Sequence, residues 1–290
     1  MKIAITGAGG FLGTQLLKQL SDRKDVTVYA FTFEAERNRS SFIKADNIID
    51  VDNSEAQTFD YSKVDVLINC AFPRNVEGVG FSQGLDFIQK VIEKAANDKV
   101  GSVINISSQS VYDQSRETPA DENTDIILDT KYAVGKYCSE LFVNSVCRNI
   151  RHTNLRMASL IGVGFDQRIT NKFVKQIMND QQLTVIGGEQ RFGYLDVRDA
   201  ASGIIAVALS DGDWDEVYNL GNDKSYTLIE IAQTAIEVGR EFGYKTKDII
   251  VKEDTTNSKQ NSSLVCNRIE LRFSWKARYK LEETLTTIFN

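Results

Sequence analysis

The sequence is poor in the residues that most often carry hydrolytic and metal chemistry. It has a single histidine, His152, so a Ser-His-Asp triad or a multi-histidine metal site would depend on that one residue. Its neighbours are polar, and we expect a surface histidine just ahead of a strand. Four cysteines lack C-x-x-C pairing and the spacing of a zinc site or disulfide framework: Cys70, Cys138, Cys147 and Cys266. We therefore expect no metal and a reducing, cytoplasmic compartment.

Long apolar runs and basic blocks are also missing. The longest apolar stretch, near 204–209, is too short to span a bilayer, and no apolar leader precedes the strand-like run after Met1. The 34 basic and 40 acidic residues form no Lys/Arg-rich block, so we expect neither nucleic acid nor membrane as a partner. The 290 residues, 42% hydrophobic and 26% charged, can bury a large core in one domain or two unequal ones.

Short apolar runs alternate with helical periodicity in the first half of the chain. Helical patterns occupy 11–20 and 87–96, and strand-like runs occupy 2–6, 26–31, 48–51, 64–71 and 102–107. This alternation predicts β-α-β units with right-handed crossovers, that is, an α/β fold with a Rossmann doubly wound parallel sheet. Strands so continuously apolar are expected to be covered on both faces.

The second half is less regular. The patterns predict helices at 130–146, 171–178, 200–209 and 228–242, and strands at 153–158 and 217–220. No linker divides the chain. We therefore predict a dinucleotide-binding domain over 1–158, rejoined by a segment at about 193–220, and a smaller, interleaved substrate domain mainly over 159–290. The polar stretch 254–263 is predicted to be a mobile loop.

A glycine-rich turn, Thr6-Gly7-Ala8-Gly9-Gly10-Phe11-Leu12-Gly13, joins the first strand to the first helix. Gly7 permits a tight turn, Gly10 lets a diphosphate approach the backbone, and Gly13 lets the helix pack closely on the sheet. The N–H groups at the start of the helix favour an anionic ligand. This context predicts a dinucleotide cofactor.

The residues that would choose between NAD and NADP leave the choice open. An acid at the end of the second strand commonly binds the ribose 2′-OH of NAD, but residues 26–32 end without a carboxylate. Glu34 could reach back and favour NAD, whereas Arg37 and Arg39 could meet the 2′-phosphate of NADP. All three could equally be solvated loop charges.

Three side chains suggest hydride-transfer chemistry. Tyr132 and Lys136 lie four residues apart on a predicted helix and share a face. A free phenol, with a pKa near ~10, is rarely ionised at neutral pH, but a neighbouring ammonium favours the phenolate. Tyr132 could then take a proton from an alcohol while hydride leaves its carbon, and Ser108 could hydrogen-bond the same oxygen. Alternatively, the Tyr-Lys spacing arises by chance and Ser108 satisfies local backbone.

Several ordered motifs resemble the extended short-chain dehydrogenase/reductases, specifically the NAD-dependent sugar epimerase/dehydratase family. The glycine turn, with Phe11 and Leu12, matches the family's G-x-x-G-F/Y-[IL]-G pattern. Asp50-Val51 resembles the pair that holds adenine, and Asn69-Cys70-Ala71 resembles the small-residue end of strand four. Further matches follow the family's order: Ser107-Ser108-Gln109-Ser110-Val111-Tyr112, Glu122, Tyr132 to Lys136, Glu140, Leu155-Arg156, 194–200, 217–221 and 271–275.

The resemblance implies a Rossmann domain, a smaller C-terminal substrate domain and a nucleotide-sugar substrate. It implies that the catalytic residues are Ser108, Tyr132 and Lys136. It implies cofactor contacts at Gly7, Gly10, Phe11, Leu12, Gly13, Asp50, Val51, Ala71, Tyr132 and Lys136. Relatives often dimerise through the Tyr-x-x-x-Lys helix, so Tyr137 and Leu141 could face a partner in a homodimer.

Two departures from the family pattern refine the expected reaction. The 4,6-dehydratases carry Thr-Asp-Glu where this chain has Ser108-Gln109-Ser110, which argues against water elimination. Residues 253–260 lack the arginines that many members use for the substrate diphosphate, leaving Arg191 and Arg268 as candidates. We predict an NAD(P)-dependent sugar-nucleotide 4-epimerase. An NADP-dependent reductase of a keto-sugar or other carbonyl is the alternative, and a non-catalytic dinucleotide sensor is the minor one.

Overall fold

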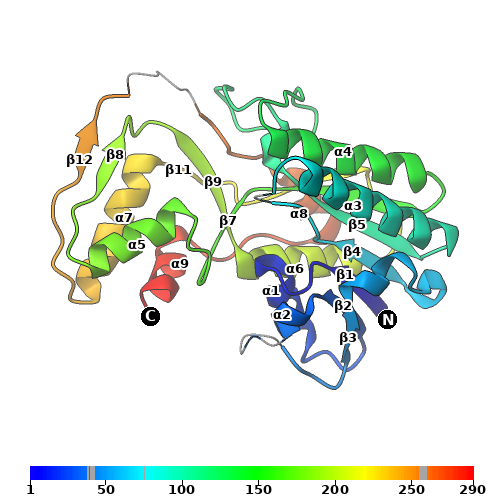
Figure 1. Cartoon of the computed structure of the whole chain (residues 1–290). Helices are drawn as coiled ribbons and strands as arrows, with labels where there is room; N and C mark the ends of the chain where they lie inside the picture. Colours follow the sequence, from blue (N-terminus) through cyan, green and yellow to red (C-terminus); the bar gives the residue numbers. More distant parts are fainter. Residues whose placement is uncertain (38, 40–42, 75, 255–259) are drawn as a thin grey trace. The chain divides into compact units, whose positions relative to one another are not determined.

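The computed structural model of the chain describes residues 1–37, 39, 43–74, 76–254 and 260–290 (Figure 1). The chain divides into two compact units. The first comprises Met1–Val111, Leu128–Arg156 and Ala201–Tyr218, and the second comprises Tyr112–Ile127, Met157–Ala200 and Asn219–Asn290. Residues 112–127 thus group with the second unit, and only part of 193–220 groups with the first, unlike the predicted ranges.

A seven-stranded sheet forms the centre of the first unit, in the order β10-β6-β5-β4-β1-β2-β3. The pairs β1–β2, β1–β4, β2–β3 and β4–β5 are parallel. The strands are β1 (Lys2–Thr6), β2 (Thr27–Thr32), β3 (Ile48–Asp52), β4 (Val66–Asn69), β5 (Ser102–Ser108), β6 (Arg151–Met157) and β10 (Val217–Leu220). Every residue of β4 and β5 is buried. This mostly parallel sheet confirms the predicted Rossmann α/β class.

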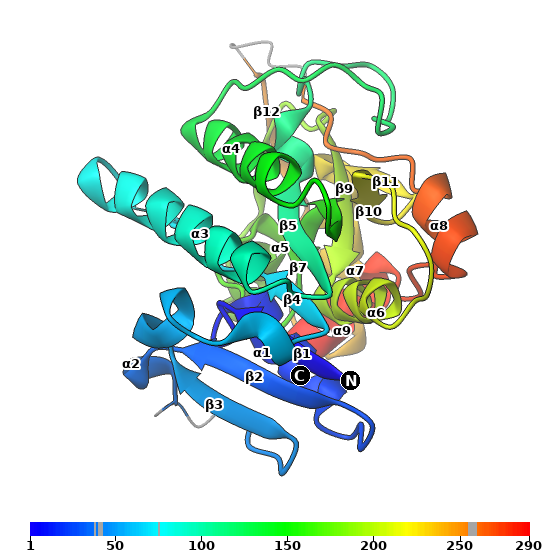
Figure 2. The same cartoon turned by 90° about the vertical axis from the view of Figure 1, so that its right-hand side faces the viewer.

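Helices cover the sheet as the strand order requires. From β1 the chain moves outward through α1 (Phe11–Leu20) to β2 and on to β3, then returns past β1 to β4, α3 (Val79–Asn97), β5 and α4 (Lys131–Val146). Right-handed crossovers in opposite directions place α1 on one face and α3 with α4 on the other, where the last two run side by side (Figure 2). Shorter or later helices are α2 (Glu34–Arg37), η1 (Asn53–Gln57), η2 (Tyr61–Lys63), η3 (Gln109–Val111) and α6 (Val197–Ala208).

The second unit combines small sheets with a helical core. Its three-stranded sheet has the order β11-β9-β7, and β12 pairs with β8. These strands are β7 (Ser159–Ile161), β8 (Thr184–Ile186), β9 (Arg191–Asp196), β11 (Ser225–Thr227) and β12 (Ile250–Lys252). The helices α5 (Ile169–Met178), α7 (Leu228–Glu241) and α9 (Leu281–Phe289) share one apolar core, and α8 spans Asn267–Phe273.

One local expectation was wrong, and a second fails over the last residues of its range. His152 is the second residue of β6 and is half-buried, with Nδ1 2.8 Å from the Ile150 carbonyl oxygen, rather than a surface residue ahead of a strand. The predicted mobile loop ends in buried backbone: Asn261 forms a bridge with Arg191, and Ser262 donates its N–H to the Arg191 carbonyl at 3.0 Å. Residues 255–259 of that stretch lie outside the described residues.

Candidate active site

The glycine turn connects β1 to α1 at the carboxyl edge of the sheet. Gly7 has φ +65°, in the left-handed region that favours glycine. A Cβ there would lie 2.9 Å from the Ala71 amide nitrogen, and one at Gly13 would lie 2.3 Å from the Gly7 carbonyl oxygen. The two glycines therefore bring the turn against the chain after β4 and bring α1 against the turn.

The N-terminus of α1 suits an anionic group. Gly10 is its N-cap, no side chain caps the helix, and its first turn contains no acid. Among the described residues other than its chain neighbours, the atom nearest to a Cβ at Gly10 would be the Gly7 carbonyl oxygen, at 3.2 Å. First-turn amides and the positive end of the helix dipole at a residue without a side chain form a setting that fits a dinucleotide diphosphate.

An acidic side chain that the sequence analysis did not single out lies against this turn. A Cβ at Gly9 would come within 2.4 Å of the Glu36 carboxyl group. Glu36 belongs to α2, and its Oε2 accepts the Phe33 N–H at 3.0 Å. The sequence feature that could have identified Glu36 is its place as the third residue of a short helix, where a carboxylate can turn back and accept a hydrogen bond at the helix start. Glu34 and Arg39 are exposed, and the Arg37 side chain lies outside the described residues.

The other predicted cofactor residues lie at the same edge of the sheet. Thr32 donates its hydroxyl to Asp50 Oδ1 at 2.5 Å, across the β2–β3 pair, and the adjacent Val51 is buried. Ala71 follows β4, where the Cys70 N–H bonds the Thr6 carbonyl at 3.1 Å. Gly7 and Ala71 therefore lie just beyond the carboxyl ends of β1 and β4, and Asp50 lies in the middle of β3, where its side chain reaches the last residue of β2.

Helix α4 presents Tyr132 and Lys136 on one face beside β5. Thr130 caps the helix by accepting the Ala133 N–H at 3.1 Å. The Lys136 side chain is buried, and its Nζ donates to the Ile106 carbonyl at 2.7 Å and lies 5.9 Å from the centroid of the Tyr132 ring. Burial lowers the pKa of Lys136, while Tyr132 and Cys70 oppose that shift by favouring the charged form. The helix thus holds a buried cation one turn from a phenol.

Ser108 is the last residue of β5 and is buried. Its Oγ accepts the Ser110 N–H at 3.2 Å and lies 3.0 Å from Ser110 Oγ. A hydroxyl has one proton and two acceptor sites. Since Ser110 supplies donors to the Ser108 oxygen, the Ser108 proton is left to be donated elsewhere, as stabilising a substrate oxygen requires.

Two further residues beside Tyr132 come from the segment after β4. The edge of the Phe72 ring meets Tyr132 at a centroid distance of 5.1 Å, and the Arg74 guanidinium carbon lies 5.9 Å from the Tyr132 ring centroid. The sequence motifs point to Ala71 at this strand end and to neither of these two residues. A sequence feature could have identified these two residues. An aromatic and a cationic residue directly follow a buried strand that ends at the cofactor edge.

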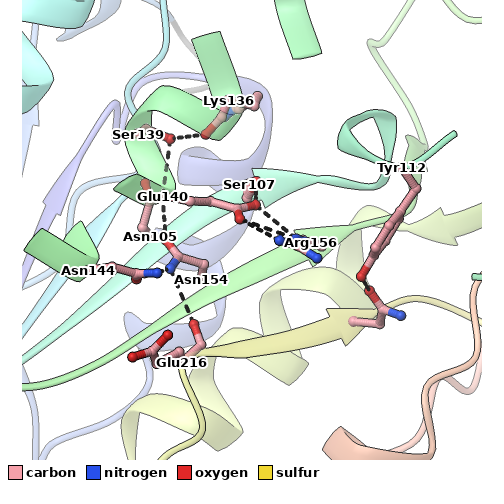
Figure 3. Close-up of polar contacts among 11 residues, drawn as sticks. Asn105, Ser107, Tyr112, Lys136, Ser139, Glu140, Asn144, Asn154, Arg156 and Glu216 are labelled. Carbon is pink, nitrogen blue, oxygen red and sulfur yellow. Dashed lines mark hydrogen bonds and ion pairs between the residues drawn. The ribbon is translucent and has the colours of Figure 1, made fainter. Parts of the chain in front are cut away.

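A buried ion pair ties α4 to the sheet (Figure 3). Arg156 in β6 donates to Glu140 in α4, with Nη2 2.7 Å from Oε2 and Nε 3.0 Å from Oε1. Ser107 in β5 donates its hydroxyl to the same carboxylate. Because Glu140 follows Lys136 by one turn, these contacts fix the rotation of the helix that bears Tyr132 and Lys136.

A chain of buried amides extends this polar layer across neighbouring strands. Thr6 Oγ1 donates to Asn69, Asn69 donates to Asn105, and Asn105 donates to both Ser139 and Asn154 at distances from 2.8 to 3.2 Å. These side chains are buried, so water cannot readily replace the partner in any of these hydrogen bonds. The layer sets one register for β1, β4, β5 and β6 beneath the site.

The two arginines proposed for substrate binding belong to the second unit. Arg191 opens β9 and is exposed, and its backbone pairs with residues 260 and 262. Arg268 in α8 is also exposed; its Nε lies 3.5 Å from Glu122 Oε2, and its Nη2 donates to Asn123 at 3.1 Å. The Arg268 guanidinium is therefore already engaged by two neighbouring side chains.

Two negative findings concern the described part of the chain. No helix there has both the length and the apolar character to cross a bilayer. Within the same residues, no group of three or more His, Cys, Asp and Glu side chains is arranged to hold a metal ion.

Known proteins resemble this chain over nearly its whole length. The low-salt glycan biosynthesis protein Agl12 of Haloferax volcanii is 22% identical, covering 98% of this chain and 96% of the relative. Among solved structures, a UDP-N-acetylglucosamine 4-epimerase from Methanobrevibacter ruminantium M1, in complex with UDP-N-acetylmuramic acid, has a TM-score of 0.82, 22% identity, and coverage of 99% and 97%. A UDP-glucuronic acid 4-epimerase from Bacillus cereus, with UDP-glucuronic acid and NAD, has a TM-score of 0.80, 20% identity, and coverage of 100% and 98%.

The structural likenesses establish a shared fold, and a family model goes further. The model for the NAD dependent epimerase/dehydratase family matches residues 3–221, well over half of the chain, including the glycine turn, Ser108, Tyr132 and Lys136. The chain is therefore an enzyme of the extended short-chain dehydrogenase/reductase type, and it belongs to the NAD dependent epimerase/dehydratase family.

Proposed function

We propose that this enzyme is an NAD-dependent sugar-nucleotide 4-epimerase with Tyr132 as its acid/base. The observation that carries the proposal is the buried Lys136 ammonium, held by the Ile106 carbonyl at 2.7 Å on the same helix face as Tyr132 and beside the strand that ends at Ser108. The similar solved structures include 4-epimerases in complex with UDP-sugars or NAD, which supports this substrate class.

Each of the three side chains has a defined task. Tyr132 takes the proton of the sugar 4-hydroxyl, and Lys136 favours the phenolate that accepts it. Ser108 donates its hydroxyl proton as a hydrogen bond to O4, which becomes a carbonyl oxygen. The glycine turn, Asp50, Val51 and Ala71 would hold NAD, which would accept a hydride from C4 and give it back to the same carbon. Tyr132 then returns its proton to O4 once the 4-keto sugar presents its other face, so no net oxidation occurs.

Residues 109 and 110 support epimerisation over dehydration. Loss of water from the sugar requires an acid and a base near the leaving hydroxyl. Gln109 carries a buried amide, and Ser110 carries a hydroxyl that hydrogen-bonds Ser108, so neither residue supplies a carboxylate. With no carboxylate at these two positions, return of hydride to the same carbon is the favoured outcome.

Glu36 favours NAD over NADP. Its carboxylate lies against Gly9 in the glycine turn, and a 2′-phosphate brought to that position would meet a negative charge. Isothermal titration of NAD and NADP to stripped protein tests this. Glu36→Gln should narrow the preference for NAD by at least fivefold, whereas Glu34→Gln, in the same short helix, should leave it unchanged. Equal affinities of the unaltered protein for the two dinucleotides would contradict the assignment.

The decisive experiment for the reaction uses purified protein without added cofactor. Denaturing one sample should release NAD, which mass spectrometry identifies. A native sample is then offered UDP-glucose, UDP-N-acetylglucosamine and UDP-glucuronic acid one at a time. One of them should be converted to its 4-epimer, and Tyr132→Phe should abolish that conversion while retaining NAD. A strict requirement for added NADPH, or conversion by Tyr132→Phe at the original rate, would overturn the proposal.

Two broader expectations accompany the reaction. The free thiols of all four cysteines are compatible with the cytoplasm that we propose as the compartment. A homodimer through α4 stays a prediction: Leu141 is exposed on that helix, and Tyr137 is half-buried. Light scattering of the purified chain measures it directly.

A further inference from the structure

Gly135 lies inside α4, between Tyr132 and Lys136, where a glycine does not stabilise the helix. Glycine weakens a helix interior relative to alanine, so Gly135 calls for a packing reason. A Cβ at this position would lie 2.6 Å from Phe81 Cζ and 3.0 Å from Phe72 Cζ. The missing methyl group therefore makes room for two aromatic rings against the helix face between the phenol and the ammonium.

Of these two rings, Phe72 is the one that contacts both members of the pair. The Lys136 Nζ lies over its face, 4.2 Å from the centroid. Its edge meets Tyr132 at a centroid distance of 5.1 Å and an interplanar angle of 79°. Phe81 packs beside it, with its centroid 6.2 Å from that of Phe72, and also lies against the helix at Gly135. Phe72 thus forms a wall shared by both side chains.

The physical need for such a wall follows from the burial of Lys136. Its side chain is 5% exposed, so the ammonium has lost most of its hydration, and this burial lowers its pKa. The titratable groups that face it are Tyr132 and Glu140 on α4, and Cys70 and Arg74 after β4; Arg74 lowers the Lys136 pKa further, and the others raise it. An aromatic face carries partial negative charge and stabilises a cation without adding a titratable group.

We propose that Phe72 is a positioning residue for Lys136. Its ring holds the ammonium between the Ile106 carbonyl and Tyr132 and keeps it protonated, and Gly135 is the position that admits the ring. The inference rests on the proposed roles of Tyr132 and Lys136 in epimerisation. It adds a residue that acts through the lysine.

The test compares Phe72→Leu with Phe81→Leu, a matched loss of ring in the same aromatic pair. The first readout is carbon-13 NMR of lysine Cε, with Lys136→Met identifying the Lys136 signal. In Phe72→Leu that signal should lose its upfield ring-current shift and titrate at lower pH, whereas in Phe81→Leu it should change little. This readout needs no turnover, so it remains decisive if the proposed reaction is wrong.

The second readout is the pH dependence of the epimerase rate. Phe72→Leu should lower kcat roughly tenfold with little change in KM, since a buried cation–π contact is lost, and should move the acidic limb of the profile to higher pH. Phe72→Tyr, which keeps the ring face, should restore both. Gly135→Ala should act in the same direction as Phe72→Leu, although alanine strengthens the helix, because its methyl group displaces the rings.

Two results would overturn the inference. One is a Lys136 signal and a pH profile that are unmoved in Phe72→Leu; the other is an equal response of Phe72→Leu and Phe81→Leu. Unchanged turnover in Tyr132→Phe would instead overturn the proposed function and leave the NMR comparison valid. If Phe72→Leu does not fold, Gly135→Ala and Phe72→Tyr give the same decision, because the Lys136 signal should shift in Gly135→Ala and stay in place in Phe72→Tyr.

Discussion

The buried pair Glu140–Arg156 offers a quantitative test of what holds α4 in place. The Arg156 and Glu140 side chains are 8% and 3% exposed, and the guanidinium Nη2 lies 2.7 Å from the carboxylate. Removing one partner of such a pair leaves an uncompensated buried charge, which costs about 3–5 kcal/mol. Arg156→Met should therefore lower the free energy of unfolding of the first unit by about that amount.

Replacing both charges should recover most of the loss. Buried pairs exchanged for apolar residues of similar volume are often neutral in stability, so Glu140→Met with Arg156→Met should be about as stable as the unaltered protein. The exposed pair Arg23–Asp25 is the control: its side chains are 40% and 64% exposed, and Arg23→Met should leave the free energy of unfolding nearly unchanged.

The two tryptophans make the assay specific to one unit. Trp214 belongs to the first unit and Trp275 to the second, so Trp275→Phe leaves fluorescence that follows only the unit containing α4. Urea unfolding is then measured for each variant in that background and in the complementary Trp214→Phe background. A loss below about 1 kcal/mol for Arg156→Met, or a double variant no better than the single, would refute the reasoning.

Three further outcomes are expected at the site. Ser108→Ala should lower kcat by roughly 10²- to 10³-fold with KM nearly unchanged, because it removes a donor to the developing carbonyl, and steady-state kinetics would show it. Gly13→Ala should weaken NAD binding and lower the melting temperature, since its methyl group would lie 2.3 Å from the Gly7 carbonyl oxygen; calorimetry measures both. Because burial lowers the Lys136 pKa below its ordinary value of 10.5, kcat/KM should fall on the alkaline side before that pH, as the ammonium loses its proton; Lys136→Arg should shift that limb upward.

The parts of this molecule that local sequence patterns determine were predictable. The strand 2–6, the helix 11–20 and the glycine turn were placed correctly, because apolar periodicity and glycine conformational freedom act within a few residues. The spacing of Tyr132 and Lys136 gave a shared helix face for the same reason. Their catalytic roles, however, remain predictions until variants are assayed.

The missed features depend on contacts between distant segments. In the second unit, the strands β7, β8, β11 and β12 have three residues each, which is too short for the alternation of apolar and polar residues to be recognised. Glu36 was passed over for Glu34, since only the fold shows which acid turns back onto Gly9. Phe72 has no motif of its own; its role follows from Gly135 and Lys136, more than sixty residues later in the chain.

The same ion pair also explains why the Lys136 ammonium does not pair with Glu140. A carboxylate one helical turn after a lysine ordinarily pairs with it. Here Arg156 and Ser107 occupy both oxygens of Glu140, and the Lys136 ammonium bonds the Ile106 carbonyl instead. Removing Arg156 therefore does more than destabilise the unit, because it releases a carboxylate that can compete for the lysine.

This competition predicts an order of activities that stability alone does not. Glu140→Gln leaves no carboxylate, so folded protein of that variant should retain more epimerase activity than folded Arg156→Met. Rates are compared well below both melting temperatures, with the folded fraction checked by circular dichroism. Equal rates, or a slower Glu140→Gln, would mean that the pair only fixes the helix. A faster Glu140→Gln would mean that Arg156 also keeps a carboxylate away from the cation that supports Tyr132.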